Sequence, residues 1–299
     1  MPPYYERFAR QLAGASDIRA ALKVSVILLA VALIAPKSLA GGSPRLRPET
    51  VAAFDQYVRL TEARNGEELR DGTNLLWIDR LKQDERALAY QALQRGEVKI
   101  QKLETRDNGE SIRFPGGMIH HWVGAVFIPG AKLPDLLHVL QDYDHQAQYY
   151  APDVERSKLV SRDGDHLVAE LRFRRHKVIT VVLNTVHDVR YFHDSHTQAH
   201  SRSSAVHIAE VENPGKPDER ENPPGQDSGF LWRMETWWRM QERDGGAYVQ
   251  SEVVSLTRDI PAGLGWLIGP FVTSIPKETL TFTLEATRRA VEAKMRPFN

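Results

Sequence analysis

The chain has 299 residues, of which 41% are hydrophobic and 26% are charged, and its 39 basic residues balance 39 acidic ones. This length suits one large domain, or one domain with an appendage, and is sufficient to bury a sizeable core. The balanced charge and the lack of a basic run argue against a nucleic-acid partner, and the absence of cysteine excludes disulfides and thiol chemistry.

Residues 1–40 have the order of a secretory signal. Basic residues precede a nearly unbroken apolar run from Val24 to Ala35, and Ser38-Leu39-Ala40 forms a small-residue cleavage site before Gly41. The apolar run is shorter than the about 20 residues that span a bilayer. We therefore predict a cleaved signal peptide and a periplasmic or extracellular protein. An uncleaved segment that anchors the protein to the inner membrane is the alternative.

Residues 41–116 are expected to form a linker and a helical appendage. A segment rich in Gly, Pro and Ser precedes Pro48, and apolar residues then recur at helical spacing in three segments up to Gly96. Gly66 and Gly72 separate these segments. A short strand is expected over residues 98–103, before a turn at Asp107-Asn108-Gly109.

From Gly117 the periodicity changes to that of strands. Residues 118–128 read as a strand, 133–148 as a helix and 275–296 as a long C-terminal helix. Between the helices, short turns separate six strand-like runs, which indicates antiparallel pairing. The joint at 212–228 is long, polar and rich in proline, so we expect a disordered hairpin tip there. The six runs cover residues 154–161, 166–176, 178–192, 197–211, 230–243 and 247–258.

This order predicts an α+β fold over residues 117–296. A seven-stranded antiparallel sheet must cover one face, and the final helix is the long element left to cover it. A sheet curved around that helix leaves space for a ligand. The pattern resembles the START/polyketide-cyclase-like superfamily, the helix-grip proteins, and within it a group of uncharacterised bacterial exported proteins. The resemblance rests on this element order and on the segments His120-His121-Trp122, Asp142-Tyr143-Asp144, 149–154, 242–246, 255–261, 263–266 and 269–271.

The resemblance implies binding of a lipid or another hydrophobic small molecule. Contact with a membrane is compatible with such a function, and we expect no cofactor. In some members of the superfamily it implies cyclase or hydrolase chemistry. Fold alone does not choose between these functions. A third hypothesis is an interaction module whose cavity is filled by its own side chains.

Alternation along residues 230–243 selects the candidate ligand-binding residues. Trp232, Met234 and Trp238 fall on one face, which we assign to the cavity, and the face with Trp237 and Arg239 is expected to be mostly solvated. The alternative is that these aromatic residues only fill the core. Neighbouring strands contribute Trp122 and Phe173, and Trp266 belongs to a glycine-rich segment that is expected to cover the cavity mouth.

Glu252 is the candidate polar group of the site. Facing inward it would be a buried carboxylate that needs a partner such as Arg202 or Arg239; the alternative is a solvated strand residue. If the protein is an enzyme, His120 or His121 would form an acid–base pair with Glu252.

No motif of established catalytic or metal chemistry is present. The histidines around His193-Asp194-Ser195-His196 match no known metal-site spacing, and the glycines from Gly263 to Gly269 lack the strand that a dinucleotide site needs. We therefore expect no metal site and no catalytic residue beyond the pair above.

Overall fold

The computed structural model of the protein describes residues 45–72, 75–176, 180–260 and 265–296, with the backbone alone for residues 265–273. The predicted signal peptide lies outside the described residues. Among the described helices, none has the length and apolar character needed to cross a membrane.

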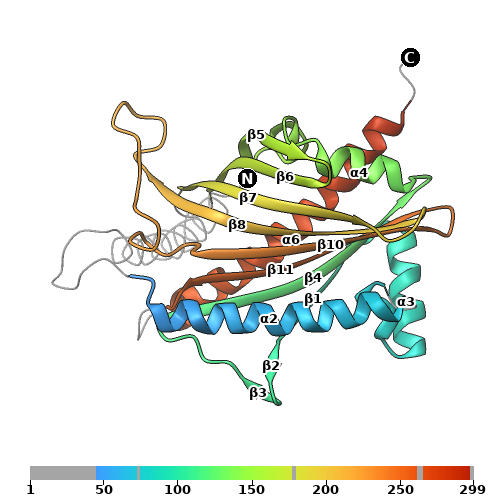
Figure 1. Ribbon diagram of the computed structural model, residues 1–299, viewed down its shortest axis with the longest axis horizontal. Coiled ribbons are helices and arrows are strands. Elements are labelled where there is room, and N and C mark those ends of the chain that lie inside the picture. The colour runs from blue at the N-terminus through green and yellow to red at the C-terminus, as the bar shows by residue number, and fades with distance from the viewer. Residues whose placement is uncertain (1–44, 73–74, 177–179, 261–264, 297–299) are drawn as a thin grey trace, which may run out of the picture. The chain divides into compact units, whose positions relative to one another are not determined.

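One antiparallel sheet organises the described chain, as Figure 1 shows, and all seven strands expected after residue 117 belong to it. The strand order is β1-β4-β11-β10-β8-β7-β6-β5, and β9 pairs with β8. Two strands are therefore additional: β1, which comes from the expected appendage, and β9, which comes from the loop expected to be disordered. The strands are β1 Lys99–Lys102, β4 Gly117–Pro129, β5 Val154–Asp163, β6 His166–His176, β7 Thr180–His193, β8 Gln198–Glu212, β9 Arg220–Glu221, β10 Arg233–Arg243 and β11 Gly246–Arg258, with a separate hairpin of β2 Arg106–Asp107 and β3 Glu110–Ser111.

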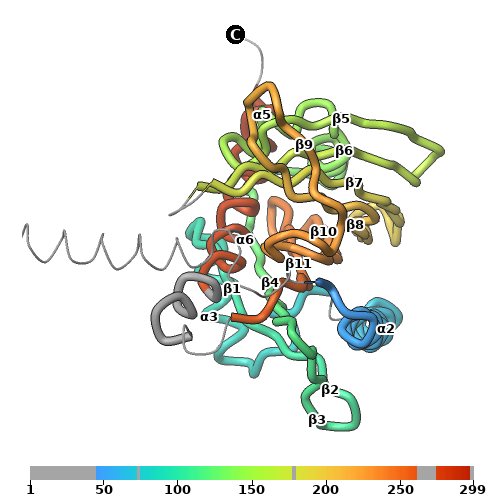
Figure 2. Tube along the Cα trace, turned by 90° about the vertical axis from the view of Figure 1, so that its left-hand side faces the viewer, coloured from blue at the N-terminus to red at the C-terminus, as the bar shows by residue number. Residues whose placement is uncertain are grey.

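The long helices α2 and α6 lie on opposite sides of this sheet, as Figures 1 and 2 show. The predicted α+β fold, an antiparallel sheet with a long C-terminal helix, is confirmed. Helix α6 begins ten residues earlier than the periodicity predicted, and the helix expected over residues 133–148 is broken in two at Asp142. The helices are α2 Pro48–Asp71, the 3-10 turn η1 Trp77–Arg80, α3 Gln83–Gln94, α4 Leu133–Gln141, α5 Gln146–Tyr149 and α6 Gly265–Met295.

Helix α6 rests directly on β4, and Gly124 permits this close approach. A Cβ atom at Gly124 would lie 2.7 Å from Cδ1 of Leu284. Leu284 is fully buried in the main core, which the inner face of the sheet, α4 and α6 build together. We call the α6 side of the sheet the inner face and the α2 side the outer face.

Helix α2 covers part of the outer face, so the sequence-based expectation that Trp237 and Arg239 are solvated is wrong. Phe54 and Tyr57 of α2 pack with Trp237 in a second core cluster, and Arg239 is 2% exposed. Alternation shows which side chains share a face of a sheet. It does not show whether a second helix covers that face, and here the predicted appendage is that cover.

The expectation of a disordered loop over residues 212–228 is also wrong. Glu219 accepts hydrogen bonds of 3.0 and 2.9 Å from the buried guanidinium of Arg172. The Asp227 carboxylate accepts a 2.9 Å bond from Nε1 of Trp232. Polar composition predicted solvation, but these charged side chains serve as partners for buried donors elsewhere in the fold.

Candidate functional site

A row of residues across the middle of the inner face defines the candidate site. Reading from β7 to β4, the directly paired residues are Tyr191, Ser201, Trp238, Ser251 and Gly124. Directly paired residues in neighbouring strands point to the same side of a sheet. Helix α6 occupies the Gly124 end of this row through Leu284, so Trp238 lies beside the line of contact with the helix.

Small residues flank the large Trp238 side chain in this row. Ser201 and Ser251 are each 1% exposed, and neither hydroxyl has a hydrogen-bond partner. Trp238 itself is only half-buried, although it packs against the main core. A buried hydroxyl without a partner costs about 1–3 kcal/mol, so two of them on either side of a half-buried ring favour a ligand or a water molecule there.

Three more of the predicted ligand-binding residues share this inner face. Trp122 on β4 and Met234 on β10 lie on it by register, and Phe173 on β6 contacts the ring of His187 with centroids 6.2 Å apart. All three side chains are half-buried. With Trp238, they form an apolar lining on three strands, and their role in binding stays a prediction.

Trp232 and Glu252 do not belong to this lining, which corrects the sequence-based grouping. Trp232 precedes β10, so strand alternation does not extend to it, and it packs in the outer-face cluster with Phe54 of α2. Glu252 points to the outer face beneath α2, where it meets His121. Trp266 belongs to the residues whose side chains lie outside the description.

Glu252 is buried and holds a polar network together beneath α2. It is 2% exposed and accepts a 2.8 Å hydrogen bond from Nε2 of His121 and a second bond from the guanidinium of Arg64. The solvated alternative is therefore wrong. Neither Arg202 nor Arg239 is a hydrogen-bond partner of Glu252, although the charge of Arg239 contributes to lowering the pKa of Glu252. Arg239 instead donates to Asn65 and Glu68 of α2.

The network continues from His121 into α2. The backbone N–H of Thr105 donates to the Tyr57 hydroxyl at 2.8 Å, and that hydroxyl lies 2.8 Å from Nδ1 of His121. With the His121 proton on Nε2, the Tyr57 hydroxyl donates to Nδ1, and each donor in the chain is matched. The geometry therefore favours a neutral imidazole that bridges a phenol and a carboxylate.

Burial and neighbouring charges fix the protonation states of this pair. Burial lowers the pKa of His121, although its hydrogen bond to Glu252 and the charge of that carboxylate oppose the shift. Burial alone would raise the pKa of Glu252, but the bond from His121 and the Arg64 guanidinium bring it below its ordinary value. A neutral His121 beside an ionised Glu252 has acid–base character. Both side chains are buried beneath α2, however, on the opposite side of the sheet from the inner face.

His120, the other histidine proposed for acid–base chemistry, lies on the inner face. It is 4% exposed, and its Nε2 is 3.0 Å from the Thr257 hydroxyl. Burial lowers the pKa of His120 to about 4, with a smaller effect from Lys102. It is therefore a neutral polar group in the wall of the candidate site at pH 7, separated by the sheet from Glu252.

Two histidines near the β7–β8 turn, His193 and His200, pair individually with carboxylates. His193 Nε2 lies 3.3 Å from Asp165, and His200 Nδ1 lies 2.8 Å from Asp194. Within the described ranges, no three His, Asp or Glu side chains gather as a metal would require.

Sequence reasoning missed the contribution of α2. Tyr57 and Arg64 are seven residues apart, so both project from one face of that helix. This spacing could have indicated that a phenol and a guanidinium meet a common polar partner. The partner itself could not be identified, because Glu252 is 188 residues from Arg64.

Comparisons with known proteins retrieve START-type structures. No family model matches the chain, and no curated protein matches it. The solved structures that resemble it include a STAR-related lipid transfer protein from Xanthomonas axonopodis, with 19% identity over 64% of this chain and 98% of that one and a TM-score of 0.41. A Zhui aromatase/cyclase from Streptomyces sp. R1128 has 14% identity over 60% and 97%, with a TM-score of 0.39. A START superfamily protein from Mycobacterium smegmatis has 13% identity over 60% and 99%, with a TM-score of 0.37.

These structures belong to the superfamily that the sequence resembles. The α+β fold of this chain follows from its own sheet order and from the packing of α6 on β4.

Proposed function

We propose that the protein binds a lipid or another hydrophobic small molecule against the inner face of the sheet, beside α6. The observation that carries this proposal is the half-buried Trp238 between the two partnerless hydroxyls of Ser201 and Ser251. An apolar ligand with one polar atom would cover the ring and accept or donate a hydrogen bond at a serine. The signal-like order of residues 1–40 supports binding outside the cytoplasm.

Two adjacent tryptophans provide a matched test. Trp238 lies on the inner face, while Trp237 is 7% exposed beneath α2 on the outer face. We expect an apolar fluorescent probe to bind the wild-type chain at saturable stoichiometry. Trp238→Ala should change its affinity about tenfold or more, yet lower the free energy of unfolding by less than the about 3–5 kcal/mol typical of a packed tryptophan. Trp237→Ala should lower the free energy of unfolding by the full amount typical of a packed tryptophan. The fraction of this variant that is folded should bind the probe with unchanged affinity.

The reverse pattern would reject ligand binding. If the wild type binds no probe and Trp238→Ala is destabilised as much as Trp237→Ala, the inner face is a filled core, and the interaction module becomes the better account. Urea unfolding and probe titration are measured on the same preparations, because an unfolded fraction would imitate lost affinity.

A further inference from the structure

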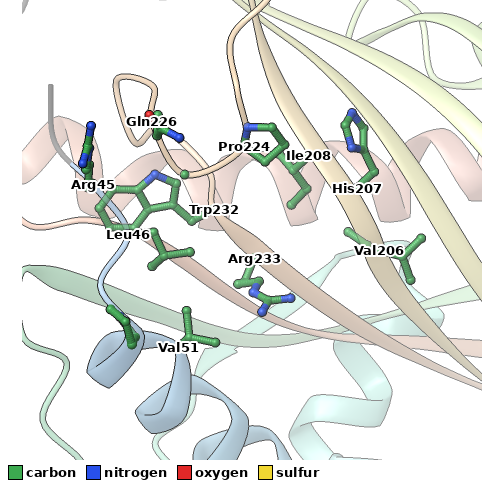
Figure 3. A pocket seen from close by; sticks show the side chains of 13 residues that line it. Arg45, Leu46, Val51, Val206, His207, Ile208, Pro224, Gln226, Trp232 and Arg233 are labelled. Atoms are coloured by element: carbon green, nitrogen blue, oxygen red, sulfur yellow. The ribbon is translucent and has the colours of Figure 1, made fainter.

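The outer face carries a pocket, shown in Figure 3, that is separate from the inner-face site. It has a volume of about 500 Å³, within the range of small-molecule sites. Its walls come from the start of α2, from β8 and from the loop before β10. The sheet separates it from the inner-face site, so its occupancy is independent of the function proposed above.

Hydrogen bonds between its walls hold this pocket open. The backbone N–H of Leu46 donates to the Gly225 carbonyl at 2.9 Å, which ties the segment before α2 to the loop. Gly225 has a φ of +72°, and a Cβ there would lie 3.1 Å from Cβ of Leu46. The bond from Trp232 Nε1 to Asp227 fixes the same loop at 2.9 Å. The pocket is therefore built by the fold rather than by loose surface side chains.

The walls combine apolar surface with positive charge. Leu46, Val51 and Trp232 line one part, and Val206 remains 60% exposed. In Figure 3 the Arg233 side chain lies among these apolar groups.

All the charged or titratable side chains in the lining are basic. They are Arg45, Arg233 and His207, and His207 lies 3.3 Å from a Glu221 oxygen. In the part of the chain that the structure describes, neither Arg45 nor Arg233 has a carboxylate or a hydrogen-bond acceptor as partner. Unpaired guanidinium groups beside exposed apolar side chains complement a ligand that has an anionic head and an apolar body.

We propose that this outer pocket binds an amphiphilic anion, an aliphatic chain that ends in a carboxylate or a phosphate. The aliphatic chain lies against Leu46, Val51 and Val206. The head pairs with Arg233, whose planar guanidinium donates two parallel hydrogen bonds to either head group, and Arg45 at the rim adds a second positive charge.

The test uses brominated ligands, which quench tryptophan emission on contact. Bromoundecanoate, bromoundecyl phosphate and the uncharged bromoundecanol are titrated below their aggregation limits into the full chain. The measured quantity is the quenching of Trp232, which is the part of the quenching that Trp232→Phe removes, because an apolar ligand at the inner face would quench Trp238. We expect at least one anion to quench Trp232 saturably and the alcohol to do so about tenfold or more weakly. The tighter of the two anions identifies the head group.

Two variants locate the site and separate it from the inner face. Arg233→Gln should weaken binding of the anion about tenfold, as expected for the loss of a charge-assisted pair. Arg59→Gln should leave it unchanged, because Arg59 is an exposed arginine of α2 outside the pocket lining. Trp238→Ala should likewise leave the quenching of Trp232 unchanged.

Three results would overturn the proposal. The first is equal quenching of Trp232 by the alcohol and by the anions. The second is equal weakening by Arg59→Gln and Arg233→Gln, which would mean attraction to net charge only. The third is loss of quenching in Trp238→Ala but not in Arg233→Gln, which would place the ligand on the inner face and leave the function proposed above intact.

Discussion

Glu252→Gln tests whether the network beneath α2 is a charged, buried attachment of that helix. The substitution keeps the shape of the side chain and one oxygen acceptor but removes the negative charge. In the native protein one carboxylate oxygen accepts from both His121 and Arg64. The contribution of each bond to the free energy of unfolding should decrease. It is about 1.5–3 kcal/mol for a bond to a charged partner and about 0.5–1.5 kcal/mol for a bond to a neutral one.

The two bonds together predict a loss of about 2–3 kcal/mol in the free energy of unfolding at pH 7. Solvent reduces the Arg64 part, because that side chain is 33% exposed and can regain water when its partner is neutral. The loss at His121 is not reduced in this way, because the His121 side chain is fully buried and cannot regain water. We therefore expect Glu252→Gln to retain the fold and to unfold at lower urea concentration.

Urea unfolding followed by circular dichroism measures this loss, with Glu104→Gln as the control. Glu104 pairs with Arg106 on an exposed surface, so its neutralisation should leave the unfolding midpoint unchanged. The Arg64→Gln and Glu252→Gln double variant should lose less than the sum of the two single variants, because they share a bond. A Glu252→Gln midpoint equal to that of Glu104→Gln would refute the argument that a buried charge holds α2 to the sheet.

Three further predictions follow from single features. Replacing residues 213–226 with Asn-Gly should lower the thermal midpoint by several degrees, because it removes Glu219 from the buried Arg172; an unchanged midpoint in calorimetry would restore the solvated-loop interpretation. Burial lowers the pKa of His120 and His187 to about 4, so the unfolded chain, with its higher pKa, takes up protons first as the pH falls. Stability should therefore decrease from about pH 6.5 to pH 4, by on the order of 2–3 kcal/mol for each histidine, and flat urea midpoints across that range would contradict this. N-terminal sequencing of exported protein should begin at Gly41, whereas a start at Met1 would indicate the anchored alternative.

Local sequence determined most of the sheet. The strand β6 has the predicted bounds, 166–176, and the short turn predicted between residues 243 and 247 is present at Asp244-Gly245. Both of its residues have positive φ, 58° and 73°, which is the geometry that a tight hairpin connection requires. Strand bounds and turns depend mainly on residues that are adjacent in the chain. Alternation and turn chemistry are patterns of such adjacent residues, so they predict these features directly.

The composition of the inner face was also partly predictable. Alternation placed Met234 and Trp238 on one side of their strand, and the structure agrees. It failed at Trp232, because the strand begins one residue later, at Arg233. A period of two holds only inside a strand, and sequence gives strand ends less sharply than strand centres.

Tertiary structure alone decided what covers the outer face and what pairs with its polar groups. The strand register pairs Glu252 with Trp237 and places both on the outer face, whereas the low frequency of buried glutamate favoured solvent for Glu252. Contacts across 188 residues bring Arg64 of α2 onto Glu252, and no local pattern records such a contact. Amphipathic spacing shows that α2 has an apolar side. Which surface of the sheet α2 packs against depends on the free energy of burying this apolar side together with the neighbouring charged groups.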